Sequence, residues 1–174
     1  MDFIEVNSEI GQLEAVILHT PGSEIEQMTP GNIHKALYSD LLNLNIAKKE
    51  YSYFETVLSK WAKTYQVMDL LTQVLSQSTA KSELLNKVLS TENMQFLFPD
   101  LIELPADRLA KYLIEGYPYI KGVHPKEFEE ERFMLKPLYN LFFTRDASSS
   151  VYDNVLNAGS QNLFYLVTAA NGET

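Results

Sequence analysis

The sequence predicts an α/β fold, because two short apolar runs flank a long amphipathic segment. Residues 13–18 form a β-branched run between turn residues, which is typical of a buried strand, and residues 67–71 are predicted to form a second strand. Between the runs, apolar residues recur at spacings of three, four and seven, as in a helix. They are Ile46, Tyr53, Phe54, Val57, Leu58, Trp61 and Tyr65. A strand, a crossover helix and a second strand make a βαβ-like start.

The middle of the chain has a helical pattern. Apolar residues at 84–89 predict one short amphipathic helix, and those at 109–113 predict another, which starts near Pro105 and ends at Gly116. Residues 127–133 are a candidate third helix with a solvated charged face. We therefore expect residues 1–72 and 134–174 to form a partial α/β core, with residues 73–133 inserted as a helical subdomain. A Ser-rich turn is expected after residue 146, followed by the strand-like run 163–167.

Composition excludes several classes of protein. The formal net charge is -9 and no Lys/Arg cluster offsets it, so nucleic-acid binding is not expected. No apolar run approaches the ~20 residues that cross a bilayer, and the acidic N-terminus is unlike a signal peptide, so we expect a cytoplasmic protein without membrane contact. The chain has no cysteine, which removes disulfides, thiolate metal sites and a cysteine nucleophile. We expect neither a metal site nor a cofactor.

The segment from Asn140 to Asp146 reads Asn-Leu-Phe-Phe-Thr-Arg-Asp and suits recognition of a planar cation. A carboxylate such as that of Asp146 can accept two parallel hydrogen bonds from a guanidinium group. The ring of Phe143 can lie against the face of that group, and Asn140 can hydrogen-bond the other end of the ligand. Composition alone favours an alternative, in which Arg145 and Asp146 are a surface pair and the aromatic residues are core.

Asn-x-x-Phe-Thr-Arg-Asp resembles the substrate-binding motif of the arginine deiminases, within the guanidino-group-modifying superfamily. Three further segments resemble that family in the same order. They are the opening strand and turn at residues 9–22, the loop at residues 28–40 and the helix at residues 109–116. The resemblance runs from about residue 5 to about residue 156.

The resemblance implies a role for four residues. Asp146 matches the aspartate that grips the guanidinium group, and Phe143 matches the phenylalanine packed on the substrate. Asn140 matches the asparagine near the α-amino and carboxylate end of arginine, and Leu37 matches a loop leucine that helps to close the pocket. Ser39 replaces an acidic residue of that loop.

The family's reaction, hydrolysis of L-arginine to L-citrulline and ammonia, requires groups that the sequence lacks. A cysteine thiolate attacks the guanidinium carbon, while a His-x-Asp pair and a glutamate assist. None of His19, His34 and His124 fits that pattern, and for His19 and His34 we expect a structural or solvated role. We therefore expect a truncated, inactive homologue with no catalytic residues, which binds L-arginine at roughly millimolar affinity or weaker.

The resemblance also implies a pseudo-fivefold fan of ββαβ modules, of which this chain holds about one, together with the helical insertion. Unpaired strand edges favour a homo-oligomer or a partner chain. Two alternatives stay open: a non-catalytic interaction or oligomerisation module built on the helical insertion, and a separate chain that supplies the missing modules. After Leu156 the sequence departs from the family, as a frameshift, an early stop or a short gene product would cause.

Overall fold

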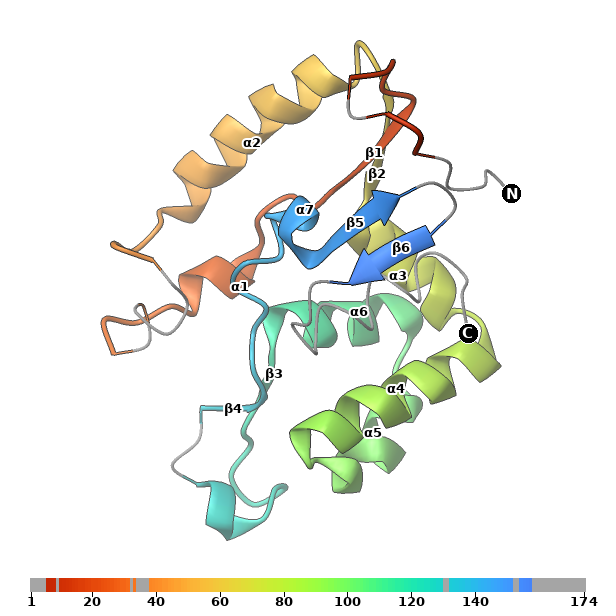
Figure 1. The fold of residues 1–174 in the computed structure, drawn as a ribbon. Coiled ribbons are helices and arrows are strands. Elements are labelled where there is room, and N and C mark those ends of the chain that lie inside the picture. Colours follow the sequence, from red (N-terminus) through yellow and green to blue (C-terminus); the bar gives the residue numbers. More distant parts are fainter. Residues whose placement is uncertain are drawn as a thin grey trace.

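The computed structural model describes residues 6–8, 10–31, 33, 38–129, 132–151 and 154–157, and for residues 146–151 and 154–157 it describes the backbone. Its helices and short sheets confirm the predicted α/β class (Figure 1). Within these residues no helix is long and apolar enough to cross a membrane.

The chain begins with the expected βαβ unit. Strand β1 (Ala15–Leu18) pairs in parallel with β2 (Lys63–Gln66), so that the carboxyl ends of both strands lie side by side. Helix α2 (Leu44–Leu58) makes the crossover, and the side chain of Asn43 caps it by accepting a hydrogen bond from the Ile46 amide at 3.1 Å. The loop after β1 contains the single-turn helix α1 (Ser23–Glu26).

The prediction of a strand at residues 67–71 is wrong, because these residues open helix α3 (Val67–Leu75). The second strand is instead β2, directly before these residues. It contains Tyr65, which the sequence pattern assigned to the preceding helix. Residues at i, i+4 and i+8, namely Val67, Leu71 and Leu75, are all buried on one face of α3. A short apolar run has no period of its own, and only the residues that follow it reveal the helical spacing.

Four further helical segments follow. Helices α4 and α6 confirm the two predicted amphipathic helices, and α6 ends at Gly116, as expected. The segments are α4 (Ser78–Glu92), η1 (Gln95–Leu97), α5 (Phe98–Ile102) and α6 (Ala106–Glu115). Together with α3 they enclose the main hydrophobic core, against which Ile17 of β1 also packs. Helix α2 lies away from α4, α5 and α6 (Figure 1).

The predicted third helix at residues 127–133 is wrong. One 3-10 turn, η2 (Lys126–Phe128), is followed by strand β4 (Phe133–Leu135), which pairs antiparallel with β3 (Tyr117–Pro118). Like charges three and four residues apart in the Glu-rich run oppose a longer helix.

The end of the described chain is a short helix and a hairpin. Helix α7 (Thr144–Ala147) leads into β5 (Ser148–Val151), which pairs antiparallel with β6 (Asn154–Asn157). The predicted Ser-rich turn is therefore wrong, since its serines form a strand. The predicted strand at residues 163–167 lies outside the described residues. The division into 1–72, 73–133 and 134–174 stays a prediction; helix α3 spans its first boundary.

Candidate functional site

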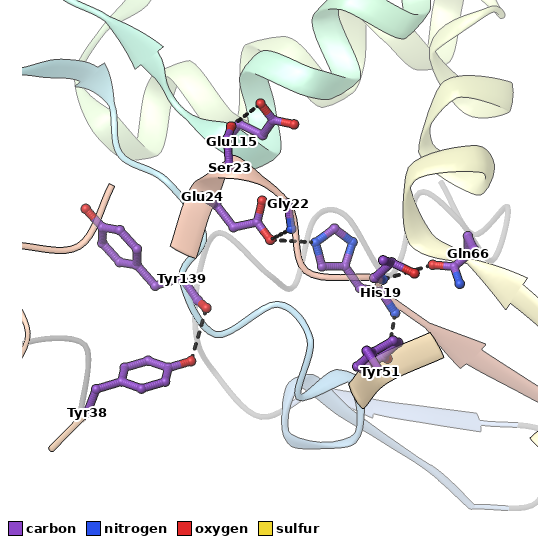
Figure 2. A network of polar contacts seen from close by, with 10 residues as sticks. His19, Gly22, Ser23, Glu24, Tyr38, Tyr51, Gln66, Glu115 and Tyr139 are labelled. Carbon is purple, nitrogen blue, oxygen red and sulfur yellow. Dashed lines mark hydrogen bonds and ion pairs between the residues drawn. The ribbon is translucent and has the colours of Figure 1, made fainter. Parts of the chain in front are cut away.

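A buried polar network begins where β1 ends. His19 and Glu24 are only 2% and 1% exposed, and the Nε2 atom of His19 lies 3.1 Å from Oε1 of Glu24. The same oxygen accepts a hydrogen bond from the Gly22 amide at 2.6 Å. Beside it, the hydroxyl of Ser23 donates to the carboxylate of Glu115, which joins α1 to α6 (Figure 2). The predicted structural role of His19 agrees with this position.

The network continues to β2 and α2. The amide of His19 donates to the hydroxyl of Tyr51 at 3.1 Å, and the amide of Thr20 donates to Oε1 of Gln66 at 3.0 Å. The Gln66 side chain in turn donates to Glu55 of α2 at 2.9 Å. Burial raises the pKa of Tyr51, while the hydrogen bond from His19 opposes that rise. These contacts fix the loop after β1 against both neighbouring elements (Figure 2).

A cavity of about 390 Å³ lies beside this loop, at the carboxyl ends of β1 and β2. Ligands of open α/β sheets commonly bind at that edge. Its lining includes His19, Glu24, Lys48, Glu55 and Asp69, so carboxylates outnumber cationic groups. The Nδ1 atom of His19 and Oε2 of Glu24 have no hydrogen-bond partner among the described residues, but both atoms are buried. In this conformation they belong to the interior and are not exposed to a ligand.

A second contact joins the loop at residues 28–40 to the segment predicted to bind a guanidinium group. The hydroxyl of Tyr38 donates to the backbone oxygen of Tyr139 at 3.2 Å, and its ring lies 6.3 Å from that of Phe142. Burial, together with the negative charge of Glu24, raises the pKa of Tyr38 to about 12. Tyr38 is therefore a neutral hydrogen-bond donor at physiological pH.

The structure places two of the four predicted site residues with their side chains. Asn140 is half-buried in a turn, where its backbone oxygen accepts from the Phe143 amide at 3.0 Å. Phe143 is 47% exposed and its ring centroid lies 4.2 Å from that of Phe142. Asp146 lies in α7, but the structure describes only its backbone. Leu37 lies outside the described residues.

Helix α7 is hydrogen-bonded to strand β1. The hydroxyl of Thr144 donates to the backbone oxygen of Ile17 in β1 at 2.9 Å, across 127 positions of sequence. The segment that contains Asn140, Phe143 and Asp146 therefore lies between two attachments, one to β1 through Thr144 and one to the loop of residues 28–40 through Tyr38. Asn140 and Phe143 are not among the described residues that line the cavity beside His19.

Two structural residues were not found by sequence reasoning. Tyr38 directly follows Leu37, but a single tyrosine in a loop carries no pattern that marks it. Glu24 follows His19 by five residues across Pro21 and Gly22, and nothing in that spacing shows a carboxylate buried against a histidine. Among the described residues, no group of three or more His, Asp and Glu side chains is placed to hold a metal ion.

Comparison with known proteins gives a consistent result. The family model described as arginine deiminase matches residues 34–157. The chain is 32% identical over 166 residues to the arginine deiminase of Lactococcus lactis subsp. lactis and 31% identical over 167 residues to that of Oenococcus oeni. These matches cover 85% and 87% of this chain but 40% of each relative. The chain thus spans about 40% of the length of these curated relatives, and it belongs to the arginine deiminase family.

Proposed function

We propose that this part of the chain supplies the arginine-recognition half of an arginine deiminase site. Asp146 would bind the guanidinium group, Phe143 would cover its face, and Asn140 and Leu37 would contact the amino-acid end. Family membership supports this assignment of roles. The observation that carries the proposal is the double attachment of the Asn140–Asp146 segment, to β1 through Thr144 and to the loop of residues 28–40 through Tyr38.

Exposure of Phe143 also supports the proposal. Its ring packs on Phe142, and the residue as a whole is 47% exposed, so part of its surface is open to a planar cation. A guanidinium group over an aromatic ring gains about 0.5–1 kcal/mol at an exposed site. One ion pair and one ring contact must offset the entropy of association, so we expect a dissociation constant of roughly 1 mM or weaker.

We further propose that a polypeptide of these 174 residues does not deiminate arginine by itself. The sequence contains no cysteine, and the family's route depends on a cysteine thiolate. Citrulline should therefore not accumulate when the purified polypeptide is incubated with L-arginine. Citrulline above the level of a protein-free control, detected colorimetrically, would overturn this part of the proposal.

Arginine recognition can be tested by titrating the protein with L-arginine and following its backbone amides by NMR. L-citrulline is the matched ligand control, because it keeps the amino-acid end and replaces the guanidinium cation by a neutral ureido group. Asp146→Asn should abolish the saturable response, whereas Asp107→Asn, which removes the same charge from an exposed site on α6, should leave it unchanged. Equal responses to arginine and citrulline, or an unaltered response of Asp146→Asn, would refute the assignment.

A second proposal concerns architecture and association. We interpret the βαβ unit and the β5–β6 hairpin as about one module of a ββαβ fan, and residues 73–133 as a helical insertion. We propose that the protein is located in the cytoplasm. Within the described residues each sheet has two strands. Unpaired strand edges promote association, so we propose that the chain forms homo-oligomers, with the insertion as an alternative contact surface. Sedimentation as a monomer at all concentrations would contradict self-association.

A further inference from the structure

The segment proposed to bind arginine is anchored at its centre by the main core. The side chain of Leu141 is 1% exposed and belongs to that core, and the amide of Leu138 donates to the backbone oxygen of Ile114 in α6 at 2.9 Å. Two consecutive turns, at residues 138–141 and 140–143, are closed by amide-to-carbonyl hydrogen bonds of 3.1 and 3.0 Å. These contacts keep the turns folded, and the two ends of the segment are placed by other contacts.

One end of the segment is fixed to strand β1 through Thr144. The amide of Lys63 donates to the backbone oxygen of Glu14 at 2.9 Å, so that this oxygen points toward β2. Because the carbonyl groups of successive strand residues point to opposite sides, the oxygen of Ile17 points away from β2. The hydroxyl of Thr144 donates to it at 2.9 Å from that open side. Thr144 thus takes the place of a neighbouring strand and sets the position at which α7 begins.

The groups assigned to the guanidinium end depend on that position. Phe143 directly precedes α7 and Asp146 lies within it, so the backbone of both residues moves with the first turn of the helix. Residues three positions apart are neighbours on a helical turn, with Cβ atoms ~5–6 Å apart. A shift of Thr144 along β1 would therefore displace both residues together.

The other end of the segment is fixed by Tyr38. Its hydroxyl donates to the backbone oxygen of Tyr139 at 3.2 Å, directly before Asn140 in the chain (Figure 2). Both tyrosines also pack against the small cluster formed by Ile25 and Met28. The residue assigned to the amino-acid end of the ligand is therefore held from the loop of residues 28–40, and not from β1.

We propose that Thr144 and Tyr38 are positioning residues for opposite ends of the ligand, Thr144 for the guanidinium group and Tyr38 for the amino-acid end. Neither side chain needs to touch the ligand. Without one of these hydrogen bonds the arrangement that binds becomes a smaller fraction of the population, and the apparent affinity falls in proportion. A half-buried hydrogen bond shifts such an equilibrium by up to about tenfold. This inference rests on the proposed arginine recognition and adds which contact controls which part of the ligand.

The test compares L-arginine with n-butylguanidine in NMR titrations of the full chain. Butylguanidine keeps the guanidinium group and the hydrocarbon chain, and it lacks the α-amino and carboxylate groups. Thr144→Val should weaken both ligands by the same factor, about three- to tenfold, and Thr144→Ser, which keeps the hydroxyl, should stay within about twofold of wild type. Tyr38→Phe should weaken L-arginine about three- to fivefold and leave butylguanidine within about twofold.

Matched variants control for the loss of a hydroxyl elsewhere. Thr72→Val removes a half-buried hydroxyl that donates to the backbone oxygen of Met68 within α3 at 2.8 Å. Tyr112→Phe removes the hydroxyl of a half-buried tyrosine on α6. Neither change should alter the affinity for either ligand. A purely structural role would lower the urea midpoint without changing the ratio of the two affinities, so this ratio in Tyr38→Phe is the decisive measurement.

The outcomes separate the inference from the proposal beneath it. A wild-type chain without a saturable response to either ligand would overturn both arginine recognition and the positioning roles. A wild-type response that persists unchanged in Thr144→Val and Tyr38→Phe would overturn the positioning roles and leave arginine recognition standing. Equal losses for both ligands in Tyr38→Phe would overturn the division between the two ends.

Discussion

The His19–Glu24 network gives a prediction whose magnitude follows from the structure. Glu24→Ala removes the acceptor of two hydrogen bonds, one from Nε2 of His19 at 3.1 Å and one from the Gly22 amide at 2.6 Å. A buried donor left without a partner, as His19 would be, costs about 1–3 kcal/mol, and the partly buried Gly22 amide costs at most that much. Truncation also removes Oε2 of Glu24, a buried oxygen that has no partner among the described residues and whose desolvation opposes folding by about 1–3 kcal/mol.

Two lost hydrogen bonds and one relieved desolvation leave a net loss of about 2 kcal/mol in the free energy of unfolding. For a chain of this length that corresponds to a melting temperature lower by roughly 4–8 °C. Glu24→Gln keeps an oxygen for both donors and should cost less than about 1 kcal/mol. Glu26→Ala, an exposed position on the same helix, should cost less than about 0.5 kcal/mol.

Urea denaturation followed by circular dichroism at 222 nm measures all four proteins under one condition. The order of stability should be wild type and Glu26→Ala together, then Glu24→Gln, then Glu24→Ala. If Glu24→Ala unfolds within about 0.5 kcal/mol of wild type, the network does not stabilise the loop after β1. If Glu24→Gln is as unstable as Glu24→Ala, the negative charge and not the acceptor geometry is what matters.

Three further predictions concern single residues. Burial lowers the pKa of His124, and the charge of Asp100 only partly opposes this effect. As the pH falls, His124 is therefore protonated in the unfolded state at a higher pH than in the folded protein. The urea midpoint should therefore fall as pH drops below the ordinary histidine value of about 6.5, and His124→Gln should lose that dependence. The pKa of Tyr38 is raised to about 12, so its ultraviolet absorbance should change near pH 12 in wild type and at lower pH in Glu24→Gln. The contribution of Tyr38 to stability is complete below pH ~10 and is lost as the pH rises to 12. Gly116→Ala should cost roughly 1–3 kcal/mol in the same urea assay, since a Cβ at φ +94° would lie 2.8 Å from Pro137; an unchanged midpoint would contradict this.

Sequence reasoning succeeded where the spacing of the apolar residues and the residues that end an element pointed to the same structure. Helix α6 has apolar residues at helical spacing between Pro105 and Gly116, and both its existence and its ends were predicted correctly. Strand β1 is a β-branched run between turn residues, and it was also found. In both cases a local pattern and its boundary signals point to one structure.

Sequence reasoning failed where tertiary contacts decide. Residues 67–71 are equally compatible with a buried strand and with the start of a helix, and burial of Leu75 against the helical core selects the helix. Ser148–Val151 has little intrinsic strand preference, yet it pairs with Asn154–Asn157 in a hairpin. Pairing with a neighbour overrode the turn propensity of the serines.

The candidate site shows the same division. A family motif marks Asn140, Phe143 and Asp146, because residue types at fixed spacing can be recognised without coordinates. The attachments that hold the motif join residues more than 100 positions apart, through Tyr38 to Tyr139 and through Thr144 to Ile17. No local spacing encodes such contacts.

Helix α2 shows the same limit at the surface of the molecule. Its apolar period predicted the helix, and the structure leaves the apolar side chains of that period exposed, among them Ile46, Tyr53 and Val57. An apolar period predicts a helix with one apolar face, and it does not state what covers that face.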